Sequence, residues 1–213
     1  MKNTLQFLSN LQSNNDQAWF MDHIGEYEMA KSEVWELAYV LLTQLAITDV
    51  KLNPETEVER FISSVINTRP KKATIYFGFF DIAISPLAND GNEPSYLIHI
   101  EPDQSYISIR YLPDVFGLQV MRNYIAKNTS TFDQILLDCY ASGFVLNKSS
   151  MIPVLPKGYP TEMEGESYIR LKEYELKSPI NLLKDRNELI QDIISTFSAA
   201  LPFVQFFRNG LGL

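Results

Sequence analysis

Hydrophobic residues occupy both alternating faces of residues 73–85, ATIYFGFFDIAIS, which is typical of a buried β-strand. β-branched and aromatic side chains on both faces need cover on both sides, so we expect this strand at the centre of a sheet. Gly78, in its middle, indicates a bulge or the close approach of another backbone. Residues 58–67 are predicted to form the preceding strand.

The clearest alternation of apolar and polar positions lies in residues 95–101 and 105–112, which we interpret as a hairpin joined by a Pro-Asp-Gln turn. The apolar set of each arm should face the core, because residues two apart in a strand point the same way. The side chains expected on the other face are polar: His99, Glu101, Tyr106 and Arg110.

Helical spacing of apolar residues flanks the strands on both sides. Residues 4–12 predict a short helix, and Asn14 or Asn15 is expected to cap a long amphipathic helix that continues unbroken to about residue 47. Pro202 should kink or restart the last helix. Beyond the hairpin, the predicted elements are helices over residues 113–127, 130–143, 165–174 and 185–200, a short strand within 144–156 and an extended link over 175–179.

These patterns predict an α+β fold in one domain that spans residues 1–213. Its mostly antiparallel sheet has its strands within residues 58–112 and is covered by the long N-terminal helix and by C-terminal helices. A chain of 213 residues with 46% apolar content is sufficient for one sizeable core, and no internal repeat indicates a second one.

Charge and cysteine content narrow the class of protein. Eighteen basic against twenty-six acidic residues give a formal net charge of −8, which disfavours binding to double-stranded nucleic acid or anionic lipid. The single Cys139 excludes an intramolecular disulfide. No apolar run is long enough to span a bilayer, and the start of the chain lacks the apolar core of a signal peptide. We therefore expect a soluble, cytoplasmic protein.

Several stretches, in the same order along the chain, resemble one known family. They are FLSNLQSNNDQAWFMDHIGEY near the start, YLIHIEPDQSYISIRYLPDVFGLQVMRNYIA in the centre, and LPKGYP, YIRLKEYELKSPI and ALPFVQFF towards the end. Together they resemble the mainly bacterial, uncharacterised family catalogued as domain of unknown function 2461. The resemblance covers most of the chain and implies no activity, because the family has none established.

One region departs from the pattern of that family, which usually carries a segment of about RDxRFSxDKxPYK after its first strand. Here the region reads RFISSVINTRPKKATIYFGF, in which RF and KK match and the Asp-Lys and Pro-Tyr-Lys elements are missing. A glycine pair in the second hairpin arm is likewise replaced by Ser108-Ile109-Arg110. The comparison with the family implies that a polar surface there is lost or remodelled.

His99 and Glu101 are the sharpest pair of candidate functional residues, because both point to one face of a predicted strand. With Asp81 as a third ligand, they have the chemistry to bind a divalent metal. The alternative, a hydrogen-bonded pair on a partly covered sheet face, is the more common arrangement, and we assign no metal ligands. The other histidine, His23, is interpreted as a packing or capping residue.

Basic residues around the hairpin and the preceding turn form a candidate anion-binding surface: Arg60, Arg69, Lys71, Lys72, Arg110 and Arg122. Such groups suit a phosphate or carboxylate ligand, or a single nucleic-acid strand stacked on Tyr76 or Tyr106. The alternative is a solvated turn with scattered surface charge.

Motifs of catalysis do not accompany these residues. The sequence has no GxSxG, HExxH or glycine-rich phosphate loop, and Cys139 lies in an apolar run where a buried, inert thiol is expected. Near the C-terminus, Phe203, Phe206 and Phe207 either close the core or form the surface of a homodimer.

Two functions of different classes follow from these observations. The first is a non-catalytic binding or interaction module for an anionic ligand or a protein partner, favoured by the missing catalytic motifs. The second is an enzyme acting on a phosphorylated or carboxylated small molecule. In that case His99 and Glu101 act as acid and base or as metal ligands, and Arg110 binds the anion.

Overall fold

The computed structural model of the chain describes residues 1–67, 75–87 and 93–213. The chain forms two compact units. Unit 1 comprises Met1–Asn89, Leu97–Ile107 and Pro179–Ile194, and unit 2 comprises Asp90–Tyr96, Ser108–Ser178 and Ser195–Leu213. The single domain expected from the sequence stays a prediction.

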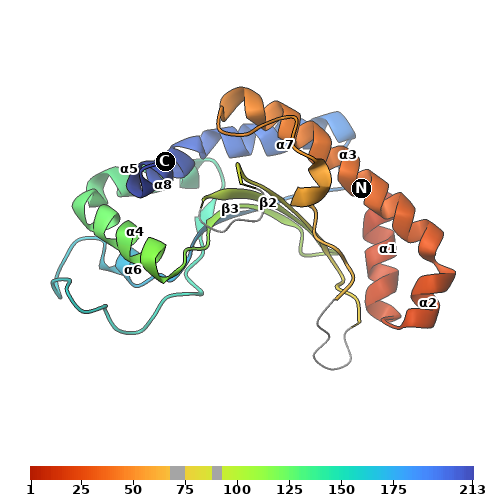
Figure 1. The fold of residues 1–213 in the computed structure, drawn as a ribbon, viewed down its shortest axis with the longest axis horizontal. Coiled ribbons are helices and arrows are strands. Elements are labelled where there is room, and N and C mark those ends of the chain that lie inside the picture. The colour runs from red at the N-terminus through yellow and green to blue at the C-terminus, as the bar shows by residue number, and fades with distance from the viewer. Residues whose placement is uncertain (68–74, 88–92) are drawn as a thin grey trace. The chain divides into compact units, whose positions relative to one another are not determined.

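Within the described residues, five strands form one antiparallel sheet in the order β1-β2-β3-β5-β4, of which β2 and β3 are labelled in Figure 1. The strands are β1 Phe80–Ile84, β2 Ser95–Ile100, β3 Tyr106–Tyr111, β4 Val145–Leu146 and β5 Tyr174–Pro179. In the register of β4 with β5, Val145 lies opposite Lys177. The predicted hairpin is β2 and β3, and each of these strands has residues in both units. The sheet and its helices confirm the α+β class.

The strand predicted over residues 58–67 is wrong in its first part. Val58–Phe61 is a 3-10 helix (η1), whereas the following residues pair antiparallel through isolated bridges, Ile62 with Ile82 of β1 and Ile66 with Tyr76. In a 3-10 helix, side chains three residues apart lie on the same side, so Val58 and Phe61 are both buried there. Val58 and Phe61 are thus buried, as the predicted strand also required, but they lie on a turn of 3-10 helix.

The segment 73–85 also differs from its prediction. The strand within it, β1, begins at Phe80 and stands first in the strand order instead of at the centre. The start of the segment, residues 73 and 74, lies outside the described residues. The sheet extends beyond residues 58–112, because β4 and β5 complete it. The stretch that was expected to be an extended link pairs as β5.

The helices of unit 1 are α1 Lys2–Ser13, α2 Gln17–Asp22 and α3 Ile24–Thr48, and α7 Arg186–Ala199 begins in this unit. In this unit α1 packs against α3, and α3 packs against β1 (Figure 1). The predicted unbroken helix is interrupted at His23, which lies between α2 and α3. Its ring stacks on Trp19 at 4.1 Å and lies 2.8 Å from the Trp19 carbonyl oxygen, which confirms a packing role.

Helix α2 is capped by Asp16 and not by Asn14 or Asn15. The Asp16 carboxylate accepts a hydrogen bond from the Trp19 N–H at 2.9 Å. Asn15 is used elsewhere: its Oδ1 accepts from the backbone N–H groups of residues 75 and 76, and its Nδ2 donates to the carbonyl of Tyr76 at 2.7 Å. The asparagine thus joins the α1–α2 connection to the segment before β1.

The helices of unit 2 are α4 Val115–Lys127, α5 Thr129–Ala141, α6 Glu166–Ile169 and α8 Leu201–Leu211, which begins before Pro202 and so confirms a restart. Helix α8 packs against α4 and α5. Its Phe207 is fully buried and contacts Tyr111 of β3 and Tyr174 of β5. The C-terminal phenylalanines therefore close the core of unit 2. They do not form the surface of a homodimer, and dimerisation itself stays a prediction.

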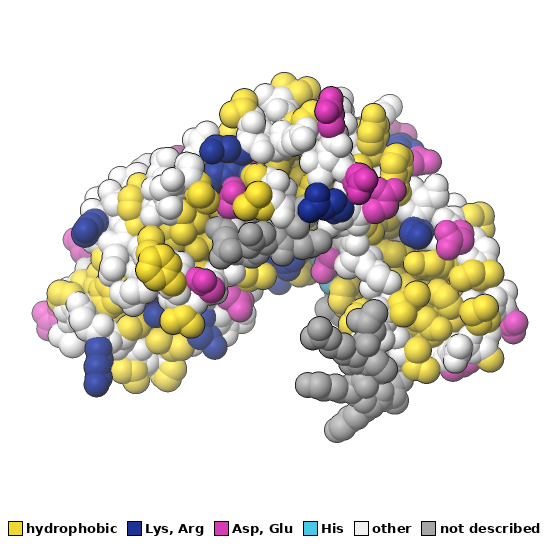
Figure 2. Space-filling model, viewed as in Figure 1, with side chains coloured by type: hydrophobic (Ala, Val, Ile, Leu, Met, Phe, Trp, Pro, Cys, Tyr) yellow, Lys and Arg dark blue, Asp and Glu magenta, His cyan; other side chains and the backbone are white. Residues whose placement is uncertain are grey.

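Hydrophobic side chains gather on the surface of unit 1 over α2 and the start of α3 (Figure 2), where Met21, Ile24 and Met29 are exposed. None of the helices in the described part of the chain is, by itself, long and apolar enough to cross a membrane. The pair α7 and α8 reaches that length and composition, with a bend of 44° between the two helices.

Candidate ligand-binding site

His99 lies between two carboxylates in unit 1. Its Nδ1 is 2.7 Å from Oδ1 of Asp81, on β1, and its Nε2 is 3.1 Å from Oε2 of Glu101, directly after β2. Strand alternation points His99 and Glu101 to the same face, and Asp81 comes from the neighbouring strand. The side chain of His99 is 12% exposed and both carboxylates are 23% exposed. We call these three residues the His99 cluster.

The charge of the His99 cluster follows from these contacts. Burial lowers the pKa of His99, but the hydrogen bonds to Asp81 and Glu101 and their negative charge together outweigh it, so the pKa is raised above 6.5. To donate to both carboxylates at once, the imidazole must be protonated, and the raised pKa favours that form. Even in that form, one imidazolium beside two carboxylates leaves the cluster with a net negative charge.

Two aromatic rings flank the imidazole. The ring centroid of Phe79 lies 4.9 Å from that of His99, and Tyr106 of β3 stacks on His99 at 4.7 Å with an angle of 25° between the planes. Aromatic faces stabilise a cation placed over them. The sequence predicted Tyr106 on this face of the sheet, and in the structure its ring stacks on the imidazole of His99 and stabilises the charged form.

Gln12, near the end of α1, completes the surroundings of the cluster and was not identified from the sequence. Its Nε2 donates to Oε1 of Glu101 at 3.2 Å and to the Gly78 carbonyl at 3.4 Å. A Cβ at position 78 would lie 2.5 Å from Cγ of Gln12, so the glycine admits this side chain. Because Gln12 and Glu101 are 89 residues apart, no local pattern signals the contact.

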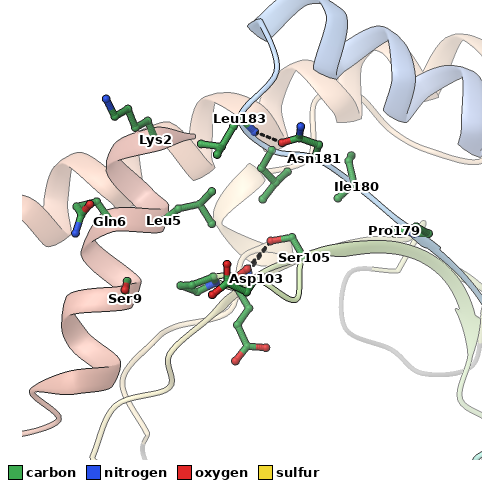
Figure 3. Close-up of a pocket in the computed structure, with 13 residues that line it drawn as sticks. Lys2, Leu5, Gln6, Ser9, Asp103, Ser105, Pro179, Ile180, Asn181 and Leu183 are labelled. Carbon is green, nitrogen blue, oxygen red and sulfur yellow. Dashed lines mark hydrogen bonds between the residues drawn. The ribbon is translucent and has the colours of Figure 1, made fainter.

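A cavity of about 590 Å³ adjoins the cluster, with Glu101 in its wall. Figure 3 shows the three segments that enclose it: α1, the turn between β2 and β3, and the chain that follows β5. Leu5 points from α1 towards the turn, where Asp103 lies (Figure 3). Both polar and apolar side chains line these walls, as is common in pockets for small molecules.

The turn that carries Glu101 and Asp103 is held by its own hydrogen bonds. The Ser105 hydroxyl donates to the Glu101 carbonyl at 2.6 Å and accepts from the Glu101 N–H at 3.1 Å. The N–H of Ile180 donates to the Ser105 carbonyl at 3.4 Å, which ties the turn to the segment after β5. Asp103 has φ of 63°, a left-handed conformation that Asp tolerates better than most residues. The wall of the cavity is therefore a defined structure.

The sequence model of the DUF2461 family, described as a conserved hypothetical protein, matches residues 3–206. The chain belongs to this family. The comparison with curated proteins and the comparison with solved structures gave no match. The resemblance of the five stretches to the family is thus confirmed, and membership of DUF2461 assigns no activity.

In this DUF2461 member, three of the predicted ligand-binding residues come together: His99, Glu101 and Tyr106. Arg110 lies on β3 in unit 2, half-buried, and its Nε has no hydrogen-bond partner among the described residues. Arg60 is exposed on η1. Arg122 is buried on α4 and donates a hydrogen bond to the carbonyl of Leu171 at 2.9 Å. The other three basic residues of the predicted anion-binding surface lie outside the described residues: Arg69, Lys71 and Lys72.

Metal binding and thiol chemistry are the other two possibilities that the sequence raises. In the described ranges, no group of three or more His, Cys, Asp or Glu side chains is arranged to hold a metal ion. In the His99 cluster, the imidazole separates the two carboxylates. Cys139 is buried on α5, and burial, with a smaller contribution from the charge of Asp138, raises its pKa to about 11. The burial of this thiol, expected from the sequence, is confirmed.

Proposed function

We propose that this DUF2461 member is a non-catalytic binding module that holds a small molecule in the cavity of unit 1. The observation that carries the proposal is the cavity of about 590 Å³ with Glu101 in its wall. This volume lies in the range of about 300–1,000 Å³ that is common for small-molecule sites. The carboxylate of Glu101 is oriented by His99 on one oxygen and by Gln12 on the other, so it is preorganised to accept hydrogen bonds from a ligand.

Binding is favoured over catalysis because the titratable groups already have partners. Both ring nitrogens of His99 are hydrogen-bonded within the protein, whereas a general base needs a free lone pair within reach of the proton that it removes. The cluster is thus suited to fixing the position and charge of Glu101.

An enzyme acting on a phosphorylated or carboxylated small molecule is the second candidate. The orientation of His99 by Asp81 favours it, since carboxylate-oriented histidines serve as acid or base in many enzymes. Turnover of a compound that binds the cavity, abolished in His99→Ala with the fold retained, would support this candidate over the first.

A thermal-shift screen of amines, carboxylates, phosphates, sugars and nucleosides tests the proposal. A compound at about a hundred times its Kd adds about 2.7 kcal/mol of apparent stability, enough to raise Tm by several degrees. In Ser9→Trp, a large side chain enters the cavity from the exposed face of α1. The increase in Tm caused by the compound should therefore be lost in this variant. The control, Ser13→Trp, makes the same change at an exposed α1 position outside the cavity wall and should keep it.

The proposal would be overturned if no compound of the screen raised the Tm of Ser13→Trp more than the Tm of Ser9→Trp. An anionic ligand, a protein partner and a cytoplasmic location, expected from the sequence, stay predictions. Of the basic residues that suggested the anion, the three that the structure describes, Arg60, Arg110 and Arg122, do not line this cavity. Lys2, which was not part of that set, contributes to its wall.

A further inference from the structure

The walls of the cavity differ in chemistry from one side to the other. Carboxylates come from the turn between β2 and β3, where Glu101 and Asp103 lie two residues apart. Aliphatic side chains come mainly from the segment after β5, among them Leu182 and Leu183, and α1 contributes Leu5 beside the polar side chains of Gln6 and Ser9. A ligand that satisfies both sides has a group that donates hydrogen bonds, or a positive charge, joined to a hydrocarbon chain.

The carboxylates leave this cavity with unmet negative charge. Even when His99 is protonated, its single positive charge faces the two carboxylates of Asp81 and Glu101, so the cluster keeps at least one net negative charge. The carboxylate of Asp103 is exposed, and the described residues supply no hydrogen bond or ion pair to it. Lys2 is the cation of the lining, and its side chain extends away from the turn (Figure 3).

We propose that the ligand of this cavity is an aliphatic amine, whose ammonium group binds Glu101 and Asp103 and whose methylene chain packs against Leu5, Leu182 and Leu183. The inference rests on the proposed function and specifies its ligand class. An ammonium has three N–H donors and no acceptor, which suits a wall of carboxylate oxygens. Charge-assisted hydrogen bonds of this kind are about twice as strong as neutral ones.

The amine differs from the anionic ligand that the sequence alone suggests. A carboxylate or phosphate placed beside Glu101 and Asp103 would meet like charge, which disfavours its binding. An alcohol of the same length would keep the methylene contacts and lose the charge. These two compounds therefore separate the contribution of the charge from that of the hydrocarbon.

The experiment is calorimetric titration of the full chain with pentylamine, pentan-1-ol and pentanoate at low ionic strength. We expect pentylamine to bind at least about tenfold more tightly than pentan-1-ol, and pentanoate not to bind. Glu101→Gln and Asp103→Asn should each lower the affinity for pentylamine by about tenfold or more. Asp103→Asn removes a carboxylate that has no partner in the described structure, so it tests the charge without disturbing His99. The control, Glu55→Gln, changes an exposed acid outside the cavity wall and should leave binding unchanged.

Equal affinity of pentylamine for wild type, Glu101→Gln and Asp103→Asn would overturn the inference, since the carboxylates would then play no part. So would pentan-1-ol or pentanoate binding as tightly as pentylamine. In either case the binding proposal stands if any compound of the screen raises the Tm of Ser13→Trp but not the Tm of Ser9→Trp. If no compound shows that difference, the failure is that of the proposed function.

Discussion

His99 shows how one residue combines local and distant constraints. The alternation of β2 points it to the same face as Glu101, while Asp81 reaches it from β1 and Tyr106 stacks on it from β3. A mostly buried charge is tolerated only where partners replace the lost hydration. Here each ring nitrogen has its own carboxylate, and so the imidazolium is stabilised in the folded state.

The raised pKa of His99 predicts a pH dependence of stability with a definite sign. Because the folded-state pKa exceeds the unfolded value near 6.5, charged His99 contributes its full stability below about pH 6.5. That contribution is lost as pH rises through the folded-state pKa. We expect His99→Gln to lower the free energy of unfolding by about 1–3 kcal/mol at about pH 6, and by less at about pH 9.

Urea unfolding of wild type and His99→Gln at both pH values measures this difference. Each comparison is made within one pH, which removes the effects of all other titrating groups. A cost of His99→Gln that is the same at both pH values would show that the charge on His99 does not stabilise the fold.

At the scale of elements, the ends of the helices depend on individual residues that their neighbours constrain. Gly165 precedes α6 with φ of +74°, and a Cβ there would lie 2.6 Å from Cγ2 of Thr129, which is buried at the start of α5. Gly25 lies in the first turn of α3, where an added Cβ would meet no atom within 4 Å. We therefore expect a substitution by alanine to have different effects at the two glycines.

We predict opposite effects of alanine at these two glycines. Gly165→Ala should lower the free energy of unfolding by about 2 kcal/mol, from the left-handed backbone and the clash with Thr129. Gly25→Ala, the matched control, should raise it by up to about 1 kcal/mol, because alanine favours the helix and meets nothing. Chemical denaturation of both variants measures the two changes in the free energy of unfolding. Equal changes would contradict the roles assigned to Gly165 and Gly25 at the starts of α6 and α3.

At the scale of the whole molecule, the two compact units share strands, since β2 and β3 each have residues in both. A strand that pairs along its length cannot separate at its middle without losing ladder hydrogen bonds. We therefore predict that the chain unfolds in one cooperative transition, in agreement with the single domain expected from the sequence.

The chain contains separate probes for the two units. Both tryptophans, Trp19 and Trp35, lie in unit 1, and Cys139, the one cysteine of the sequence, is buried in unit 2. Tryptophan fluorescence and thiol labelling after a short urea pulse should give the same midpoint. Cys139→Ala should abolish the labelling and keep the fluorescence transition. Two separate midpoints would show that the units unfold independently.

The sequence predicted the parts of the fold that depend on local spacing. The hairpin β2–β3, the helix α4 and the restart at Pro202 were read from periodicity and from proline, and the pair His99 and Glu101 followed from a spacing of two in a strand. The region 58–67 was misread, because apolar residues at its start suit a strand and a 3-10 turn equally. Here the neighbouring structure selected the turn.

By itself, the sequence determined the α+β class, the β2–β3 hairpin, the approximate bounds of α4, α5 and α7, and which polar residues share a strand face. The tertiary structure alone decided that Asp81 and Gln12 meet the His99–Glu101 pair and that a cavity lies beside Glu101. The physical reason is the range of the interactions. Periodicity records whether a residue faces the core, but the partner of a polar group far along the chain is set by how the elements pack.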